Sequence, residues 1–319
     1  MTLLCVDQLV KIFPAQKTWW GKVKSPEFNA VKGISFSIKE GENVGLLGSN
    51  GAGKTTTIQM LLSTLLPTAG QITYFGKNFF THRSEILQHV GFASTYARLP
   101  GGLTVMENLH LYGRLYGLSY TKRIESIQYY LKRFDLWHVR DQETCSLSAG
   151  QKTGIMLAKA FLAEPRIVLL DEPTAALDPD IAQEVRTFVI QQQKERGVSF
   201  LFTSHNMSEV NQICDRVLVM QKGRIIANNT PQQLAASVSK VRVDLMVVDG
   251  LKRAIVHAQT QGLIYMVHGR TIEVEVDEQA IAHLLQALAG LGVQYTEIGI
   301  KKPSLEDYFL RLVQKGREQ

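Results

Sequence analysis

The sequence predicts an α/β protein with a large domain built on a mainly parallel sheet and a smaller α+β domain after it. Short apolar segments alternate with amphipathic helical segments, which predicts the parallel sheet. Two of the apolar segments end in a glycine-rich turn or in acidic residues, as strands that carry a binding site often do. The pattern changes after Leu234, so we expect one domain over residues 1–238 and a second over 239–319.

Length and composition agree with two ordinary globular domains. The chain has 319 residues, of which 45% are hydrophobic and 20% charged. The three cysteines form no metal-ligand pattern, and an odd number favours a reducing compartment. No apolar run approaches the roughly 20 residues of a membrane span, and we find no signal peptide. The net charge of +6 suits polyphosphate or an anionic membrane surface, but without a basic stripe it gives no reason to expect nucleic acid.

The elements of the large domain follow from local patterns. Apolar and polar residues alternate over 30–39, as in a strand with one buried face. Residues 14–28 contain Pro14 and Pro26 and are predicted to form an exposed loop. The predicted strands are 2–13, 30–39, 43–47, 167–170 and 199–203, and the predicted helices are 54–66, 104–135, 154–163, 179–196 and 206–214.

The small domain is predicted to run β-α-β-β-α-β, the order of a ferredoxin-like unit, and to end in a further helix. Apolar residues alternate with acids over 271–277, and a helical stripe of apolar residues covers 281–288. Ser304 and Asp307 have the spacing of a capping box at the start of the last helix. The predicted strands are 241–248, 263–268, 271–277 and 293–299, and the helices are 250–260, 278–291 and 304–315.

A phosphate-binding loop follows the strand at 43–47. The pattern G-x-x-x-x-G-K-[ST] is formed by Gly48, Ser49, Asn50, Gly51, Ala52, Gly53, Lys54 and Thr55, with Thr56 directly after it. The glycines allow backbone N–H groups to surround phosphate oxygens, and the following helix adds the positive end of its dipole. Lys54 can reach the β- and γ-phosphates, and the Thr55 hydroxyl can ligate Mg²⁺. The loop therefore predicts a nucleoside triphosphate and Mg²⁺ as ligands.

Two acids end the strand at 167–170. Adjacent residues on a strand point to opposite faces, so we expect Asp171 and Glu172 to have different roles. Asp171 can hold the Mg²⁺ shell, and Glu172 can orient and deprotonate the attacking water. Taken alone, the pair also fits a solvated strand end. It gains weight because it follows a phosphate loop at the strand ends where α/β sheets bind ligands.

Two further segments are candidates for phosphate contacts. Ser148 and Gly150 open the helix at 154–163, and a helix N-terminus binds anions, although a serine there also fits a simple helix cap. His205 follows the strand at 199–203 and could donate a hydrogen bond to the γ-phosphate, although a lone histidine is often structural.

In their order along the chain, GSNGAGKTT, LSAGQ, IVLLDEPTAALD and TSH closely resemble the ATPases of ABC transporters over residues 1–238. The resemblance implies an ABC cassette: a P-loop NTPase with a RecA-like parallel-sheet core, an antiparallel β part and a helical subdomain. It implies that LSAGQ is the signature, with Ser148, Gly150 and Gln151 contacting nucleotide, and that Ala176, Leu177 and Asp178 form the D-loop. It also implies that His205 is the switch histidine and that Phe13 stacks on adenine; a core role for Phe13 remains open.

The resemblance further implies ATP hydrolysis in a dimer, because members of this family hold each ATP between the phosphate loop of one subunit and the signature of the other. With one of each in this chain, a homodimer or a pair with a related subunit is expected. PSLEDYFLRL near the end looks like the ending of ATPases that work with ABC-2-type permeases, many of them exporters. We therefore expect a cytoplasmic ATPase bound to the membrane through a separate permease.

One position departs from the family pattern. After the strand at 90–92 the family usually has a glutamine that contacts Mg²⁺ and couples to the permease, and here Thr95 stands in its place. Thr95 is a shorter oxygen ligand. Thr95 leaves open a nucleotide-binding module with weak hydrolysis, although Glu172 and His205 oppose it. A second alternative is an ABC ATPase that never meets a membrane. The second usually carries two cassettes or a long coiled coil, neither of which is found in this sequence.

Overall fold

The computed structural model describes residues 1–17, 19–20, 23–94, 99–175, 177–238 and 240–315. The chain divides into two compact units, Met1–Thr230 and Pro231–Gln319. The division falls before the boundary predicted at residue 238. The reason is helix α8 (Pro231–Ala236), which packs against the last helix of the chain, α11 (Leu305–Lys315), and so belongs to the second unit.

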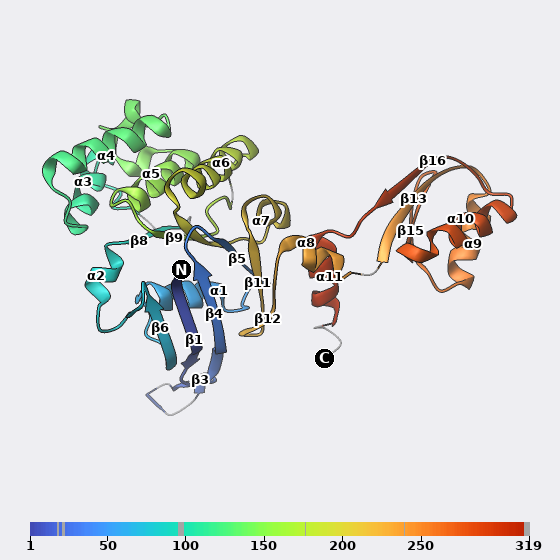
Figure 1. Cartoon of the computed structure of the whole chain (residues 1–319), viewed down its shortest axis with the longest axis horizontal. Helices are drawn as coiled ribbons and strands as arrows, with labels where there is room; N and C mark the ends of the chain where they lie inside the picture. Colours follow the sequence, from blue (N-terminus) through green and yellow to red (C-terminus); the bar gives the residue numbers. More distant parts are fainter. Residues whose placement is uncertain (18, 21–22, 95–98, 176, 239, 316–319) are drawn as a thin grey trace. The chain divides into compact units, whose positions relative to one another are not determined.

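A six-stranded sheet forms the centre of the first unit (Figure 1). Its strand order is β12-β11-β5-β10-β9-β8, and every neighbouring pair is parallel except β11–β12. The strands are β5 (Asn43–Leu47), β8 (Val90–Ser94), β9 (Ile167–Asp171), β10 (Ser199–Thr203), β11 (Arg216–Gln221) and β12 (Arg224–Asn229). β5, β9 and β10 are buried along their whole length, as their continuous apolar sequences predict.

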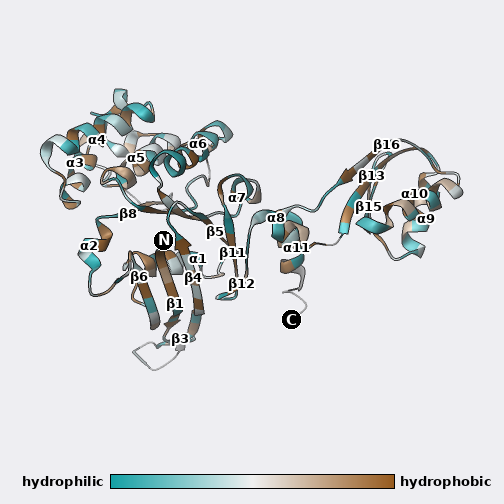
Figure 2. Ribbon diagram, viewed as in Figure 1, coloured by the Kyte–Doolittle hydropathy of each residue, from teal (hydrophilic) through white to brown (hydrophobic). Residues whose placement is uncertain are grey.

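A second, antiparallel sheet has the order β4-β1-β6-β7. Its strands are β1 (Thr2–Phe13), β4 (Phe28–Lys39), β6 (Ala69–Tyr74) and β7 (Lys77–Asn78). The hydrophobic residues of β1 and β4 (brown in Figure 2) share one buried cluster with α1 (Lys54–Leu61) and with the central sheet. The segment predicted as an exposed loop carries a short ladder between β2 (Gln16–Lys17) and β3 (Val23–Ser25).

The helices of the first unit are α2 (Arg83–Leu87), α3 (Val105–Leu115), α4 (Tyr120–Arg133), α5 (Ala149–Phe161), α6 (Pro179–Arg196) and α7 (Met207–Ile213), with short 3₁₀ turns at Trp137–Val139 and Thr144–Ser146. α3, α4 and α5 pack together as a helical group. The segment predicted to be helical over 104–135 forms two helices, α3 and α4: Gly117, at φ 74°, lies in the break between them, and Ser119 caps α4. α1 also ends early, at a turn where Ser63 has φ 56°.

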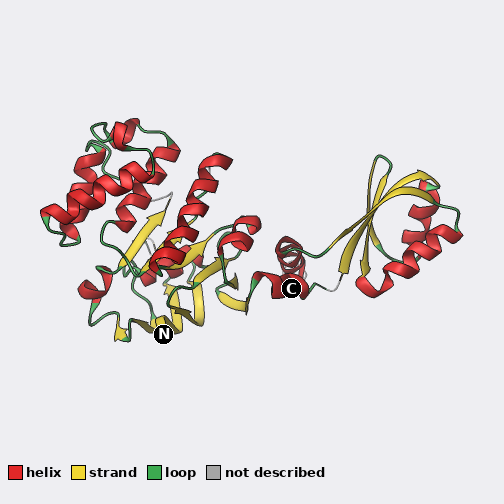
Figure 3. Ribbon diagram, turned by 45° about the horizontal axis from the view of Figure 1, so that its top comes forward, coloured by secondary structure: helices red, strands yellow, loops and turns green. Residues whose placement is uncertain are grey.

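The second unit contains a four-stranded antiparallel sheet in the order β14-β15-β13-β16, and the helices α9 and α10 lie on one face of that sheet (Figure 3). Its elements are β13 (Lys240–Asp249), α9 (Leu251–Thr260), β14 (Ile264–His268), β15 (Thr271–Asp277), a 3₁₀ turn at Glu278–Ala280, α10 (Ile281–Gly290) and β16 (Gln294–Lys301), followed by α11. This is the predicted β-α-β-β-α-β order. The predicted capping box is present too: Ser304 Oγ accepts a hydrogen bond from the Asp307 N–H, and Asp307 Oδ2 accepts one from the Ser304 N–H.

Each unit has its own core. In the second unit, alternate residues of β13 and β15 bury their side chains against Ala254 of α9 and against Leu284 and Leu288 of α10. Across the described residues, no helix is both long enough and apolar enough to cross a membrane.

Candidate functional site

The strands that precede the phosphate loop, Glu172 and His205 end at one edge of the central sheet. Parallel pairing aligns Thr203 with Leu46 of β5 and with Asp171 of β9, and Asp171 in turn pairs with Ser94 of β8. The carboxyl ends of these four strands therefore lie side by side at one edge of the sheet, which is where open α/β sheets bind ligands.

The phosphate loop lies between β5 and α1. Glycine is required at Gly53, whose φ is 109° and where a Cβ would approach the Ala30 carbonyl oxygen to 2.6 Å. A Cβ on Gly48 would lie 2.4 Å from the Met220 carbonyl oxygen. Close backbone packing thus explains both glycines. α1 has no side-chain cap at its N-cap residue and no acid in its first turn, so its terminal N–H groups suit an anion.

Lys54 stands at the start of α1 with only 7% of its surface exposed. Its Nζ donates to the carbonyl oxygens of Gly48, at 2.7 Å, and Ser49, at 3.3 Å. Burial lowers the pKa of the Lys54 ammonium, and the carboxylates of Glu172 and Asp171 oppose that shift. A buried ammonium whose main partners are neutral carbonyls would gain from an anionic phosphate. Thr55, the next residue, is exposed.

Asp171 is the last residue of β9 and is 4% exposed. Thr203 Oγ1, on the neighbouring strand β10, donates a hydrogen bond of 2.7 Å to Asp171 Oδ1. This bond fixes the orientation of the carboxylate at the strand end. Hard oxygen donors such as Asp171 and the Thr55 hydroxyl fit Mg²⁺, which takes few protein ligands and completes its shell with water and substrate phosphate. Among the described residues, no group of three or more acidic, His or Cys side chains has an arrangement that could hold a metal ion.

Glu172 faces His205 across the next turn. His205 Nδ1 lies 2.7 Å from Glu172 Oε2; the histidine side chain is 69% exposed and the glutamate side chain 12%. Glu172 has φ 52°, and its N–H donates to Thr203 Oγ1 at 3.0 Å. The two acid side chains have different partners, Thr203 and His205, and strand alternation is not what separates them. β9 ends at Asp171, and a left-handed turn rather than strand alternation directs Glu172 away.

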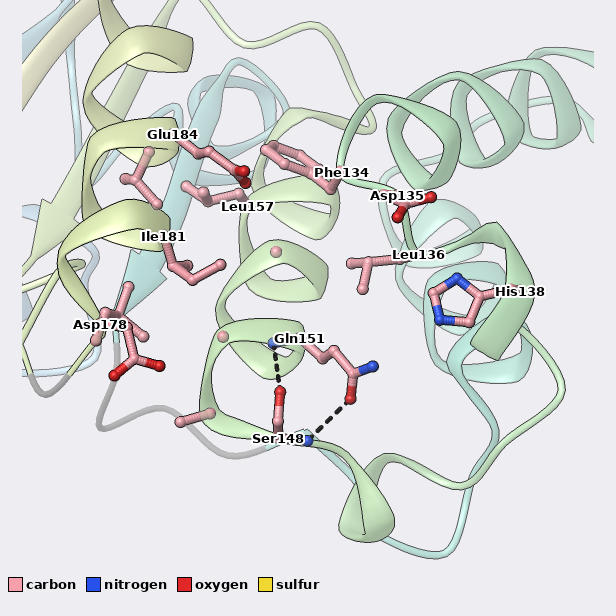
Figure 4. Close-up of a pocket in the computed structure, with 15 residues that line it drawn as sticks. Phe134, Asp135, Leu136, His138, Ser148, Gln151, Leu157, Asp178, Ile181 and Glu184 are labelled. Carbon is pink, nitrogen blue, oxygen red and sulfur yellow. Dashed lines mark hydrogen bonds between the residues drawn. The ribbon is translucent and has the colours of Figure 1, made fainter.

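The Ser148 segment begins α5. Ser148 Oγ accepts a hydrogen bond from the Gln151 N–H, and the Gln151 side chain accepts one from the Ser148 N–H (dashed in Figure 4). The open alternative of a serine-capped helix is thus correct. Ser148, Gly150 and Gln151 border a pocket of about 400 Å³ that Asp178, the N-cap residue of α6, also lines (Figure 4). The capping box holds the predicted signature at this surface of the first unit.

Phe13 is the residue predicted to stack on adenine. Phe13 ends β1 with 37% of its surface exposed and with Lys11 Nζ 5.2 Å from its ring centroid, so the alternative of a core residue is wrong. Thr95 and Ala176 lie outside the described residues.

Sequence reasoning missed the hydroxyl groups that support the acids. Thr203 bonds to both Asp171 and Glu172, and Thr174 donates to the buried Glu209 of α7. Thr203 could have been found, because a polar residue at the end of a buried strand next to an acidic strand is placed to bond with it. The contact between Thr174 and Glu209 could not have been predicted, because it joins residues that are far apart in the sequence.

One known protein family matches part of this chain, and individual relatives match nearly all of it. Residues 31–175 match the family described as "ABC transporter". The Nod factor export ATP-binding protein I of Burkholderia lata is 33% identical over 291 residues, which cover 90% of this chain and 92% of that protein. The bacitracin transport ATP-binding protein BcrA of Bacillus licheniformis is 29% identical over 324 residues, covering 99% and 98% respectively.

Solved structures match the fold as well. The cbiO1 protein of Clostridium perfringens, described as part of the ABC transporter complex cbiONQ, is 29% identical with a TM-score of 0.61, over 74% of this chain and 91% of that one. Because the two sequence relatives align over nearly all of both chains, the similarity extends beyond residues 31–175 into the second unit.

Proposed function

Because this chain belongs to the ABC transporter family of ATP-binding proteins, we propose that it binds ATP with Mg²⁺ and uses hydrolysis to drive export through a separate membrane permease. The observation that carries the proposal is the carboxyl edge of the central sheet, where the phosphate loop, Asp171 and the Glu172–His205 pair adjoin. Export is proposed because relatives of similar length are named for it.

The residues divide the chemistry of the site as follows. Lys54 and the loop Gly48–Thr56 hold the phosphates, and Thr55 and Asp171 would ligate Mg²⁺, which supplies charge stabilisation on the phosphate oxygens when bound. Thr95 is kept as a further ligand, from its position in the sequence. Glu172 orients and deprotonates the attacking water, and His205, 2.7 Å from it, holds that carboxylate and contacts the γ-phosphate.

Dimerisation completes the proposed mechanism. Ser148, Gly150, Gln151 and Asp178 border one pocket, and we propose that this surface contacts the ATP of a second subunit, most simply a second copy of this chain. Phe13 offers an exposed ring for adenine. Closure on ATP and opening after hydrolysis would move the permease. We propose that the permease holds the chain at the cytoplasmic face of the membrane, and that residues 239–319 form a ferredoxin-like accessory domain.

A single substitution tests hydrolysis and coupling together. Glu172→Gln removes the proposed base but leaves the phosphate loop intact, so we expect ATP affinity within about twofold of wild type and a fall in turnover of about a hundredfold or more. A tagged Glu172→Gln chain, purified with ATP from detergent-solubilised membranes of the native host, should recover a multi-span membrane protein in stoichiometric amount. Lys54→Ala, which should lose tight ATP binding, is the matched control.

Two results would contradict the proposal. Turnover near that of wild type in Glu172→Gln would reject the assigned base. Recovery of a soluble partner alone, or of nucleic acid, would favour an ABC ATPase without a role in transport.

A further inference from the structure

A buried carboxylate is hydrogen-bonded to the two turns that carry the proposed catalytic pair. Glu209 is on α7, and its side chain is 5% exposed. Moving a carboxylate out of water carries a large cost unless hydrogen bonds or a cation compensate it. The Glu209 carboxylate therefore needs hydrogen-bond donors in the core, and the positions of those donors indicate its role.

Three donors reach the Glu209 carboxylate from three different segments. Thr174 Oγ1 donates to Oε2 at 2.7 Å, and Ser204 Oγ donates to the same oxygen at 3.1 Å. Arg186 Nη1, from α6, donates to Oε1 at 3.0 Å. Thr174 and Ser204 are themselves buried, at 8% and 2% exposure. These are charge-assisted bonds in a protected place, where such bonds are strongest.

Each of the two hydroxyl donors lies close in sequence to one member of the catalytic pair. Thr174 lies two residues after Glu172, in the turn that begins with the left-handed Glu172 backbone. Ser204 directly precedes His205, and its Oγ also accepts a hydrogen bond of 2.9 Å from the Asn206 N–H, so the turn that carries His205 is closed on both sides. One carboxylate oxygen thus holds both halves of the Glu172–His205 contact.

The other oxygen extends the connection to a third segment. Arg186 lies on α6, the helix whose N-cap residue is Asp178, and α6 packs against α7. The Arg186 guanidinium is also held by Gln183 Oε1, through Nε at 3.1 Å and Nη2 at 2.8 Å. Glu209 therefore ties the helix that begins at the proposed dimer contact to the turns of the hydrolytic pair.

We propose that Glu209 is a positioning residue: its carboxylate sets the distance between Glu172 and His205 through Thr174 and Ser204, and links that distance to α6 through Arg186. The inference rests on the proposed roles of Glu172 and His205. It extends them by identifying what holds two side chains from separate loops within 2.7 Å. Catalysis depends on such positioning, since small displacements of a base lower turnover without changing substrate affinity.

The test compares hydrolysis with binding in shape-matched variants of the full chain. Glu209→Gln keeps the size of the side chain but has a single acceptor oxygen for three donors. Thr174→Val removes the hydroxyl and keeps the shape, whereas Thr174→Ser restores the hydroxyl. The exposed Glu195→Gln on α6 is the control carboxylate. For each variant, kcat and KM for ATP with Mg²⁺ and the thermal midpoint are measured.

We expect Glu209→Gln and Thr174→Val to lower kcat about tenfold with KM within about twofold of wild type, because the phosphate loop is untouched. Thr174→Ser should keep at least about half of wild-type kcat, and Glu195→Gln all of it. If Glu209→Gln does not fold, Thr174→Val and Ser204→Ala test the proposal by the same criterion, a lower kcat with an unchanged KM.

Wild-type kcat in folded Glu209→Gln and Thr174→Val would overturn the proposal. So would a parallel loss of kcat, ATP affinity and thermal midpoint in all variants, with no recovery in Thr174→Ser, since that pattern describes a residue that only maintains the fold. Failure of the proposed function has a different signature: the wild-type chain itself would then hydrolyse no ATP.

Discussion

At the scale of single residues, the site depends on buried polar groups that are each held by specific hydrogen-bond partners. Asp171 is oriented by Thr203, and Lys54 by carbonyl oxygens of its own loop. The motif residues could be predicted from the sequence because phosphate chemistry restricts which residue types can stand at those spacings. Their supporting hydroxyls obey no such spacing, so they become visible only when parallel pairing brings strand ends together.

Lys159 on α5 is a buried cation outside the catalytic site. It is 7% exposed, and the rings of Phe92 and Tyr112 lie 5.7 and 5.1 Å from its Nζ. Burial lowers the pKa of Lys159 to about 8. A lowered lysine pKa means that the unfolded chain binds this proton more tightly than the folded chain does. The charge on Lys159 therefore lowers the free energy of unfolding by its full amount below pH 8, and this effect disappears as the pH rises toward 10.5.

We therefore expect Lys159→Met to raise the free energy of unfolding by about 1–3 kcal/mol at pH 7. The gain over wild type should shrink between pH 8 and pH 10, because the wild-type amine is then neutral in the folded chain. Urea unfolding of both proteins at pH 7 and pH 9.5 checks this. Equal gains at the two pH values would mean that packing, rather than charge, sets the difference.

At the scale of elements, helix starts carry much of the function. α1 and α5 both begin at predicted phosphate contacts, and their N-terminal regions differ: α1 has a glycine without a capping side chain, and α5 has a full capping box. The sequence predicted both starts, because glycine and serine at a helix N-terminus have clear physical preferences. It did not predict the break between α3 and α4, since the amphipathic pattern continues through Gly117 and hides the interruption.

The α5 cap allows folding to be separated from nucleotide contact. Aspartate caps helices about as well as serine, so Ser148→Asp should leave the thermal midpoint within a few degrees of wild type. Its negative charge would face the phosphates of the partner's ATP, so turnover should fall about a hundredfold. Differential scanning fluorimetry and an ATPase assay measure the two effects.

Ser119→Asp is the matched control for that change, because Ser119 caps α4 in the same way, accepting a hydrogen bond from the Lys122 N–H. It should retain wild-type turnover. A Ser148→Asp chain that hydrolyses ATP normally would remove Ser148 from the proposed contact with nucleotide.

At the scale of the whole molecule, the predicted family and the cassette fold are confirmed by the comparisons. Sequence patterns were sufficient because β5, β9 and β10 are short apolar segments, and β4 and β15 alternate between apolar and polar residues. The division between the units was harder to predict: α8 follows β12 of the first unit after a single residue, and only its packing against α11 assigns it to the second unit.

Two separate cores predict two separable unfolding transitions. Leu288 is 1% exposed in the core of the second unit, so Leu288→Ala should lower the stability of that unit by about 2–5 kcal/mol. ATP with Mg²⁺ is bound by the first unit, so it should raise only the midpoint temperature at which the first unit unfolds. Calorimetry with and without nucleotide resolves the two. If Leu288→Ala and ATP shift one shared transition, the units unfold as a single cooperative body.

The left-handed backbone of Glu172 also bears on how this protein would respond to directed evolution. A non-glycine residue at φ 52° costs on the order of 1 kcal/mol, and asparagine is the side chain that tolerates this region best after glycine. A library selected only for heat resistance should therefore accumulate asparagine or glycine at position 172. The selected chains would then no longer hydrolyse ATP. Laboratory selection would have to monitor hydrolysis at every round to keep the acid in place.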